Sequence, residues 1–289
     1  MTGVTETRWE FSAIGTSWQI QTSSPLPAAI RDAVAALIEA FDRDWSRFRA
    51  DSLVATLARD GGAVAAPPDT AAMLDAYVEL SVATAGAVNP LVGDALARRG
   101  YDAGYGFIDH GARASPRDWT ARLDWSEETL RLSSPALIDV GALGKGRLVD
   151  RVLAEIAPWA DGRIVVDASG DLAVRAGPER VGLEHPYDPR RAIGVWEVTD
   201  AALCASATNR RAWGDGLHHV LDARTGHPVR TVAATWALAA DAMTADAAAT
   251  ALFFEGGPEL AHRWDVQWVR MTTDGRVEWS PDCKAELFS

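Results

Sequence analysis

The sequence has little cysteine and a deficit of positive charge. Its 289 residues include two cysteines, Cys204 and Cys283, which lie far apart and form no CxxC pair, so neither a disulfide framework nor a cysteine-based zinc site is expected. Lys and Arg number 28 against 40 Asp and Glu, a formal charge of −12. This balance argues against general nucleic-acid binding, which needs a basic face. An anionic ligand would need a metal ion or local basic residues to enter.

The sequence also lacks a long apolar segment. No uncharged apolar run approaches the ~18 residues of a membrane-spanning helix. The N-terminal segment carries Glu6, Arg8 and Glu10 where a secretory signal needs an apolar core, and no early cysteine offers a site for lipid attachment. We therefore expect a cytoplasmic protein without direct membrane insertion. Apolar residues at 48% and charged residues at 24% are typical of a globular chain.

Hydrophobic periodicity predicts several helices. Apolar residues from Ile30 to Trp45 recur at three-to-four spacing, which indicates a helix with one buried stripe. Asp69 is a candidate N-cap for a later helix. The predicted helices cover residues 26–48, 52–59, 69–85, the segment after the glycine turn near 144, and 241–255.

Strand-like segments fill much of the remaining chain. Residues 8–22 read as a strand that Gly15 and Thr16 interrupt, 86–122 as an irregular region, and 122–138 as a hairpin. After residue 163, short β-rich segments alternate with turns. Because helices and strands mix without a regular βαβ rhythm, we expect an α+β fold with mostly antiparallel sheets and flanking helices. No linker is apparent, so residues 1–289 are expected to form a single domain.

The strongest local feature is the segment Asp139-Val-Gly-Ala-Leu-Gly-Lys145-Gly146. Its glycines let the backbone approach a ligand closely, and a helix that starts here presents free N–H groups and its positive dipole end. Lys145, between Gly144 and Gly146, adds a full positive charge. The combination suits a phosphate or pyrophosphate, although the GxxxxGK[ST] and GxGxxG spacings are absent. A glycine-rich strand-to-helix turn without a ligand is equally compatible with these residues.

A second feature is Asp246-Ala-Ala-Ala-Thr250. In a helix these two polar residues lie one turn apart on the same face, and a carboxylate with a hydroxyl can hold a hard cation such as Mg²⁺. Asp241 falls on a different face. The same spacing is also common by chance on exposed helical faces.

Two turn motifs complete the set. The segment at 218–228 reads HHVLDARTGHP; a strand would point His218 and His219 to opposite faces, so at most one enters a shared site. Its D-x-x-T-G-x-P part indicates a turn. Ser169-Gly170-Asp171 is another tight turn after an apolar strand. Both segments are also compatible with purely structural turns.

The order of these motifs resembles the bacterial FAD:protein FMN transferase family, whose members were formerly called thiamine-biosynthesis lipoproteins. The matching motifs are D-x-G-A-x-x-K-G-x-x-x-D at 139–150, S-G-D at 169–171, H-H-x-x-D-x-x-T-G-x-P at 218–228 and A-D-A-x-A-T-A-L-F at 245–253. The resemblance covers about residues 11–255. The sequence departs from the family pattern at Ile14, at Asn89 where aspartate is usual, and at Ser169, which replaces the first glycine of a G-G-D turn.

The resemblance implies two lobes that enclose an FAD cleft. It implies an Mg²⁺ site made by the backbone oxygen of Ala142 and the side chains of Asp246 and Thr250, and it places Lys145 near the flavin nucleotide and His219 near the phosphates. The remaining positions implied to contact the cofactor are Asn89, Gly144, Gly146, Ser169, Gly170, Asp171 and Ser206.

The implied activity is Mg²⁺-dependent transfer of FMN from FAD to a threonine or serine hydroxyl of an acceptor protein, with release of AMP. The acceptor would bear an Asp-x-x-x-Ser/Thr-Ala-Thr type motif. Lys145 would stabilise charge; His219 is the first candidate for the general base because an unperturbed imidazole has a pKa of about 6.5, and Asp246 is the second. The alternatives are a pyrophosphatase that hydrolyses FAD to FMN and AMP, and a non-catalytic flavin-binding protein.

Overall fold

The computed structural model describes residues 7–288 and consists of one large sheet, a smaller sheet and covering helices. Within these residues nine strands form the large sheet, in which β1 to β15 follow the order β1-β2-β6-β7-β8-β13-β14-β15 and β16 pairs with β8. Every pairing in it is antiparallel. Its strands are β1 (Thr7–Ala13), β2 (Thr16–Thr22), β6 (Ile164–Asp167), β7 (Asp171–His185), β8 (Asp188–Ala207), β13 (Val232–Ala239), β14 (Gln267–Thr272), β15 (Val277–Trp279) and β16 (Glu286–Leu287).

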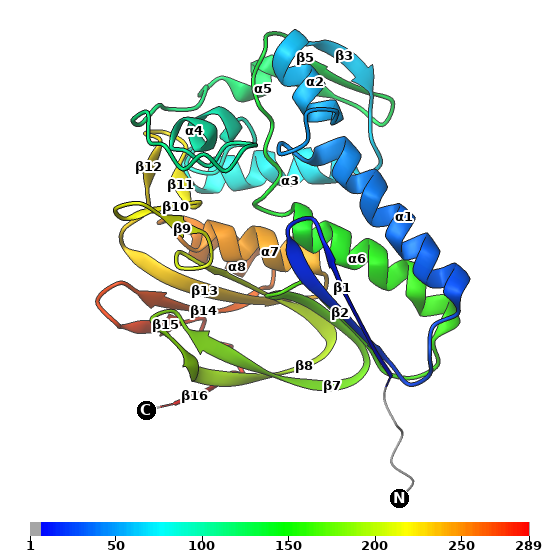
Figure 1. The fold of residues 1–289 in the computed structure, drawn as a ribbon. Helices are drawn as coiled ribbons and strands as arrows, with labels where there is room; N and C mark the ends of the chain where they lie inside the picture. The colour runs from blue at the N-terminus through cyan, green and yellow to red at the C-terminus, as the bar shows by residue number, and fades with distance from the viewer. Residues whose placement is uncertain (1–6, 289) are drawn as a thin grey trace, which may run out of the picture.

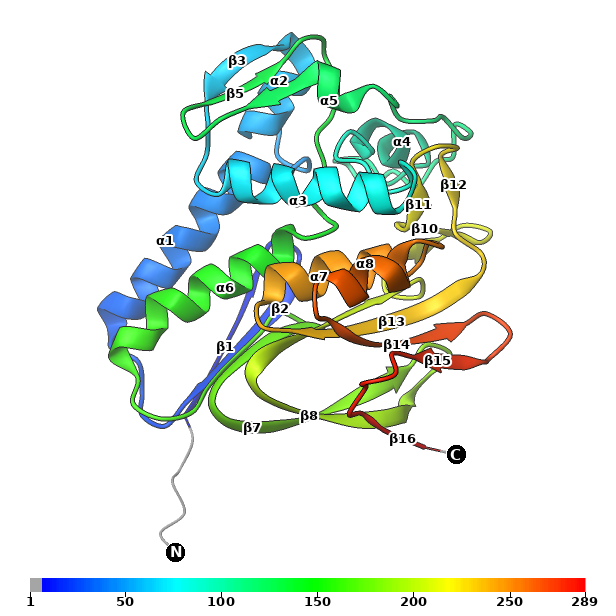
Figure 2. The same cartoon turned by 180° about the vertical axis from the view of Figure 1, so that it is seen from behind.

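The helices lie on one side of this sheet (Figures 1 and 2). They are α1 (Ala28–Trp45), α2 (Leu53–Asp60), α3 (Thr70–Ala83), α4 (Gly93–Arg98), α5 (Trp119–Arg122), α6 (Gly144–Ile156), α7 (Ala242–Ala251) and α8 (Gly257–Arg263), with a 3-10 turn at Ala157–Trp159. Helices α6, α7 and α8 form the layer next to the sheet, and α3 crosses above them. No helix among the described residues is long and apolar enough to cross a membrane.

The part farthest from the large sheet contains α2, α4, α5 and a small antiparallel sheet (Figure 2). That sheet has the order β3-β5-β4, with β3 at Gly62–Ala65, β4 at Leu123–Trp125 and β5 at Thr129–Leu132. Two short ribbons connect this part to the large sheet: β9 (Ala212–Trp213) with β10 (Leu217–His218), and β11 (Leu221–Asp222) with β12 (His227–Pro228). The α+β class with mostly antiparallel strands is therefore confirmed.

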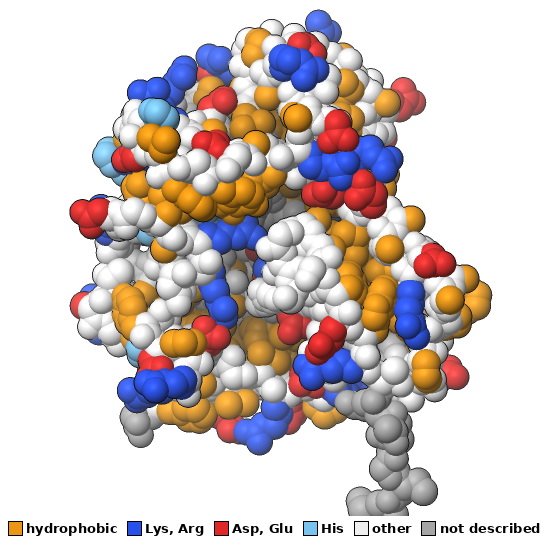
Figure 3. Space-filling model, viewed as in Figure 1, with side chains coloured by type: hydrophobic (Ala, Val, Ile, Leu, Met, Phe, Trp, Pro, Cys, Tyr) orange, Lys and Arg blue, Asp and Glu red, His pale blue; other side chains and the backbone are white. Residues whose placement is uncertain are grey.

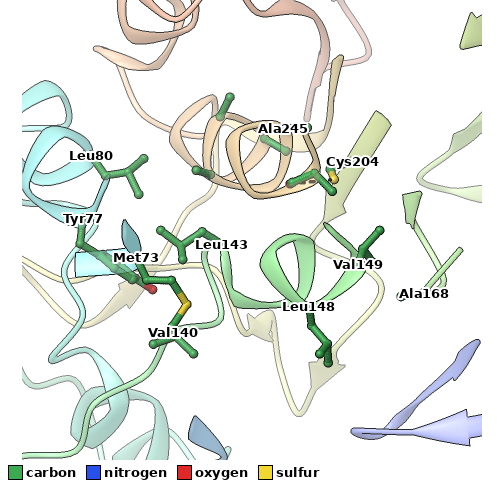
Figure 4. Close-up of a cluster of buried hydrophobic side chains, with 14 of the residues drawn as sticks. Met73, Tyr77, Leu80, Val140, Leu143, Leu148, Val149, Ala168, Cys204 and Ala245 are labelled. Atoms are coloured by element: carbon green, nitrogen blue, oxygen red, sulfur yellow. Dashed lines mark hydrogen bonds between the residues drawn. The ribbon is translucent and has the colours of Figure 1, made fainter. Parts of the chain in front are cut away.

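Helix α7 is buried on nearly every side. Six of its alanines are buried, and so is Asp246, which is 5% exposed. Because alanine side chains are small, the helix can pack closely between α6, β8 and β13. An exposed helical face is therefore the wrong interpretation of the D-x-x-x-T spacing. Figure 4 shows Ala245 of α7 beside Cys204 of β8, whose thiol donates to the Ala242 carbonyl at 3.4 Å.

Several expected elements differ from the structure. The strand expected at 8–22 is a hairpin, because Ile14 and Gly15 form a turn with φ values of 46° and 72°. The region expected to be irregular contains α4 and α5, and an additional strand, β3, follows α2. The helix expected at 241–255 ends at Ala251, and α8 follows it.

Asp69 precedes α3, as expected, but it makes no capping hydrogen bond. Its φ is 69°, and its carboxylate instead pairs with Arg147 at 2.5 Å and Arg151 at 3.3 Å, both on α6. The residue therefore connects two helices. A local sequence pattern does not contain this information, because the partners lie about 80 positions away.

Candidate functional site

The loop before α6 is held from two sides. The Tyr77 hydroxyl of α3 donates to the Asp139 carbonyl at 2.9 Å and accepts from the Ala142 N–H at 3.3 Å, and Figure 4 shows Tyr77 beside this loop. Burial, followed by the nearby Asp139 carboxylate, raises the pKa of Tyr77 well above its ordinary value, so the hydroxyl stays protonated. The Asp139 carboxylate pairs with buried Arg47 at 2.5 Å. These contacts fix the backbone at Ala142.

The carboxylate of Asp246 meets the first turn of α6. Its Oδ2 accepts a hydrogen bond from the Gly146 N–H at 2.9 Å. Burial, followed by the Asp171 carboxylate, raises the pKa of Asp246 well above its ordinary value, although Lys145 and the Gly146 N–H act in the opposite direction. The two segments singled out in the sequence, about 100 residues apart, are therefore in direct contact.

Lys145 extends from the same turn of α6 towards the S-G-D turn. Its Nζ lies 3.1 Å from Asp171 Oδ2 and donates to the carbonyls of Ala168 and Ser169 at 3.3 Å each. Burial lowers the pKa of Lys145, but Asp171 and Asp246 outweigh it and raise the pKa above its ordinary value. Lys145 is therefore charged at neutral pH. Asp171 is 1% exposed, and its Oδ1 has no hydrogen-bond partner.

The charges and donor types at this site fit a divalent cation. The raised pKa of Asp246 indicates that the surrounding positive charge does not fully stabilise its ionised form. A carboxylate, the Thr250 hydroxyl and the Ala142 carbonyl are hard oxygen donors of the kind that Mg²⁺ binds. The described residues contain no cluster of three His, Cys, Asp or Glu side chains arranged to hold a metal. A site here would therefore depend on main-chain, hydroxyl and substrate oxygens as well as on Asp246.

These groups line one cavity of about 960 Å³. In Figure 3 the surface is hollowed between the upper and lower parts of the molecule, with hydrophobic side chains above the hollow and basic side chains beside it. This volume lies at the upper end of the range of small-molecule and cofactor sites, roughly 300–1,000 Å³. The sequence-predicted residues that line it are Asn89, Ala142, Gly144, Lys145, Ser169, Gly170, Asp171, Ser206, His219, Asp246 and Thr250.

Gly146 is the predicted contact residue that does not line the cavity. A Cβ at this position would lie 2.1 Å from the Ala242 carbonyl oxygen and 2.8 Å from the Asp246 Cβ. The absence of a side chain therefore permits the close approach of α6 to α7. The structure therefore gives Gly146 a role in helix packing.

Asn89 lines the cavity, but its side-chain amide already has main-chain partners. Its Nδ2 donates to the Pro116 carbonyl at 2.8 Å, and its Oδ1 accepts from the Leu91 N–H at 2.8 Å. The residue is 3% exposed. These bonds connect two loops at the cavity wall.

One of the two adjacent histidines lines the cavity, as expected, although β10 ends at His218 and His219 lies in the bend that follows it. His219 lines the cavity, whereas His218 is absent from its walls and its Nε2 lies 2.8 Å from the Val229 carbonyl oxygen. The Nδ1 of His219 is buried without a hydrogen-bond partner. Burial, followed by the positive charge of Arg211, lowers the pKa of His219 to about 3. The imidazole is therefore neutral at pH 7.

The S-G-D turn is strained and is anchored to the N-terminal hairpin. Ser169 has a φ of 56° and Gly170 a φ of 106°, and a left-handed conformation of a non-glycine residue costs on the order of 1 kcal/mol. The Ser169 hydroxyl donates to the Ser17 carbonyl at 2.8 Å. This bond connects the S-G-D turn to β2, next to the hairpin turn at residues 14–16, which also lines the cavity.

The structure also places a cluster of aromatic side chains at the cavity, which the sequence did not predict. Phe48 and Tyr105 stack with centroids 5.1 Å apart, and Tyr101 lies 5.3 Å from Trp213. Phe107 lies 5.9 Å from Trp213. Aromatic faces of this kind suit a planar ring system. The run Tyr-Asp-Ala-Gly-Tyr-Gly-Phe at 101–107 is the one local signal that could have indicated it.

Four arginines on the cavity wall were also missed: Arg47, Arg49, Arg210 and Arg211. Arg47 stacks on the rings of Phe48 and Tyr101 at 4.1 and 4.6 Å. Arg210 pairs with Glu184 at 3.0 Å. In a chain of formal charge −12, these residues bring basic groups to a wall that also carries the carboxylates of Asp42, Asp139, Asp171, Glu184 and Asp246.

The fold is shared with solved proteins. The chain is similar to the ApbE protein of Thermotoga maritima, with a TM-score of 0.82, 23% identity, and coverage of 96% of this chain and 97% of that one. It is similar to the flavin transferase ApbE of Vibrio cholerae, with a TM-score of 0.79 and 20% identity over 96% and 98% of the two chains. At these identities the likeness concerns the fold.

The chain is also similar in sequence to proteins named FAD:protein FMN transferase. The chain is 28% identical over 313 residues to an FAD:protein FMN transferase of Rhodobacter capsulatus, which covers 96% of this chain and 57% of the relative. A protein of the same name from Treponema pallidum (strain Nichols) is 27% identical, with coverage of 84% and 77%. A third, from Klebsiella pneumoniae (strain 342), is 26% identical, with coverage of 52% and 50%. The chain thus spans about half of the length of the Rhodobacter and Klebsiella relatives.

A sequence model of the ApbE family matches residues 14–268, which include all the residues assigned above to the cavity. This is most of the chain, and the matched segment contains both the 139–150 motif and the helix with Asp246 and Thr250. The chain therefore belongs to the ApbE family.

Proposed function

We propose that this protein transfers FMN from FAD to a threonine or serine hydroxyl of an acceptor protein in an Mg²⁺-dependent reaction that releases AMP. One observation supports this more than any other: Asp246, Thr250, Lys145 and Ala142 line a single cavity, and Asp246 is hydrogen-bonded to the turn that carries Lys145. The relatives named FAD:protein FMN transferase support the same reaction.

The metal ligands in this proposal are the Asp246 carboxylate, the Thr250 hydroxyl and the Ala142 carbonyl. A bound Mg²⁺ would screen the charge of the FAD pyrophosphate and polarise its oxygens. The neighbouring residues have defined tasks. Tyr77 holds the Ala142 backbone, and the Gly146 N–H orients the Asp246 carboxylate. Both contacts are made before any ligand binds, so the donor atoms are preorganised.

The remaining cavity residues bind and orient FAD. The aromatic cluster of Phe48, Tyr101, Tyr105, Phe107 and Trp213 is suited to the flavin or adenine ring by stacking. Lys145 presents its ammonium group near the phosphates. The acceptor hydroxyl oxygen then forms a bond to the phosphorus on the FMN side, and the bond from that phosphorus to the bridging oxygen breaks, so that AMP leaves with that oxygen.

His219 is the proposed acceptor of the hydroxyl proton. Its pKa of about 3 keeps it neutral and able to take up a proton, but it is a weak base in the empty cavity. The negative phosphates of bound FAD would raise this pKa towards the useful range. Asp246 is the second candidate. A mutant of His219 that loses the acidic limb of the pH–rate profile, where protonation of the base slows the wild type, would support the first assignment.

The test is an incubation with FAD and Mg²⁺, with and without a carrier protein that displays an Asp-x-x-x-Ser/Thr-Ala-Thr loop. We expect AMP release and a mass increase of one FMN on the carrier. AMP release that is equal with and without carrier, and leaves the carrier unmodified, would indicate an FAD pyrophosphatase instead. A yellow protein that never releases AMP would indicate a non-catalytic flavin-binding protein.

A further inference from the structure

Asp150 of α6 binds the start of the neighbouring helix α7. Its Oδ1 accepts from the Ala242 N–H at 2.7 Å, and its Oδ2 accepts from the Met243 N–H at 2.9 Å. These are two of the N–H groups that the first turn of a helix leaves without an intrahelical partner. Asp150 is not part of the cavity wall. Its carboxylate is therefore committed to α7 rather than to a ligand.

Helix α7 already has its own N-cap. The Asp241 side chain accepts from the Thr244 N–H at 2.8 Å, which is the usual local way of closing a helix start. Asp150 adds a second carboxylate from a different helix. Capping alone does not require this arrangement, so the distinctive consequence of Asp150 is the connection between α6 and α7.

The connection occurs at two levels, one helical turn apart. Asp150 and Gly146 are four residues apart on α6, and Ala242 and Asp246 are four residues apart on α7, so each pair lies on one face of its helix. Asp150 bonds at the level of Ala242, and the Gly146 N–H bonds to Asp246 at 2.9 Å. The missing side chain of Gly146 lets the two helices approach this closely.

The surroundings of Asp150 make this link sensitive to change. Burial is the largest influence and raises its pKa to about 6, the two α7 N–H groups lower it, Asp241 raises it and Arg147 lowers it. The carboxylate is therefore ionised at pH 7. A neutral replacement loses the attraction to the positive end of the α7 dipole as well as hydrogen-bonding capacity.

We propose that Asp150 is a positioning residue that holds α7 in the register at which the Asp246 carboxylate meets the Gly146 N–H, and thereby sets the affinity of the site for a divalent cation. The inference rests on the metal ligands of the proposed function. It concerns cation binding to the free protein and does not depend on the identity of the acceptor.

The test compares Asp150→Asn with the wild type by titration calorimetry with Mg²⁺ and, as a second probe, Mn²⁺, without FAD. The amide of the Asp150→Asn variant keeps one acceptor oxygen, but its NH₂ group would face one of the two N–H groups of α7, so that two donors oppose each other. We expect cation affinity to fall at least tenfold, which is the size of effect that outer partners of metal ligands typically have. FAD affinity in EDTA should stay within twofold, because Asp150 does not line the cavity.

Asp241→Asn is the matched control. It weakens a carboxylate cap on the same helix but leaves the α6–α7 link intact, so cation affinity should change less than twofold. Asp150→Ser keeps one acceptor and should give an intermediate loss; it decides the question if Asp150→Asn does not fold. Wild-type affinity in either Asp150 variant, or an equal loss in Asp241→Asn, would overturn the proposal. A wild type that binds cations but transfers no FMN would contradict the proposed function alone.

Discussion

Replacement of Gly146 by alanine tests the contact between α6 and α7 most directly. The new Cβ would lie 2.1 Å from the Ala242 carbonyl oxygen, 2.6 Å from its carbon and 2.8 Å from the Asp246 Cβ. The first of these is roughly 1.3 Å short of the 3.4 Å at which ordinary contact begins. The opposing atoms are mostly main chain, so no side-chain rotation relieves the clash, and α7 must move away.

Close packing and helix propensity predict opposite changes in stability for Gly146→Ala. Alanine in place of glycine within a helix ordinarily stabilises by about 0.5–1 kcal/mol. Overpacking of a rigid contact costs about 1–3 kcal/mol, and the displacement also lengthens the 2.9 Å bond between the Gly146 N–H and Asp246. We therefore expect Gly146→Ala to be destabilised, with a melting temperature roughly 2–8 °C lower.

Thermal unfolding followed by circular dichroism measures the change in melting temperature. Titration of the folded variant with Mg²⁺ measures cation affinity, which we expect to fall more than tenfold. Gly182→Ala on β7 is the control, because its Cβ would meet its nearest neighbour at 3.8 Å. It should behave as wild type in both assays. A Gly146→Ala protein as stable as wild type, or more stable, with unchanged Mg²⁺ affinity, would refute the packing argument.

Three further predictions concern the cavity. Asp246→Ala should lower the rate of AMP release from FAD by more than about 100-fold, because it removes the one carboxylate proposed as a metal ligand; a variant with wild-type turnover and Mg²⁺ affinity would exclude that role. Thr250→Val should weaken Mg²⁺ binding by about tenfold in calorimetry, since one neutral donor is lost. His219 has a lowered pKa of about 3. Below about pH 6.5 the unfolded chain therefore takes up a proton at this residue while the folded protein does not. The free energy of unfolding then falls by about 1.4 kcal/mol for each unit by which the pH is lowered. Urea unfolding at pH 7.5 and 5.0 should therefore show wild type losing about 2 kcal/mol more than His219→Gln; equal losses would contradict the assigned environment.

The sequence predicted the elements that carry a strong local pattern. The apolar stripe of α1 is buried at Ile30, Val34, Ile38, Phe41 and Trp45, as its spacing indicates. The antiparallel α+β class was also predictable, because the segments after residue 163 are short, β-rich and separated by turns. Element boundaries were less certain: Ala251 ends α7 earlier than the apolar composition of the following residues suggests.

The structure added information that no local pattern contains. Asp69 pairs with two arginines of α6, and Asn89 connects two loops, because partners far along the chain compete for these polar groups. The cluster around Tyr101 and Trp213 joins aromatic residues from separate segments. Each of these aromatic residues, taken alone, suggests ordinary core packing.

The electrostatics of the cavity explain why a cation and an anionic dinucleotide would bind together. Lys145 is paired with Asp171, so its charge is largely used within the protein, while burial and Asp171 raise the pKa of Asp246. A pyrophosphate that entered alone would approach carboxylates in a medium of low polarity, where like charges repel strongly. A divalent cation bound at Asp246 would reverse the local sign of charge. The carboxylates that repel the pyrophosphate of FAD would therefore bind the divalent cation, and the bound cation would in turn attract the pyrophosphate.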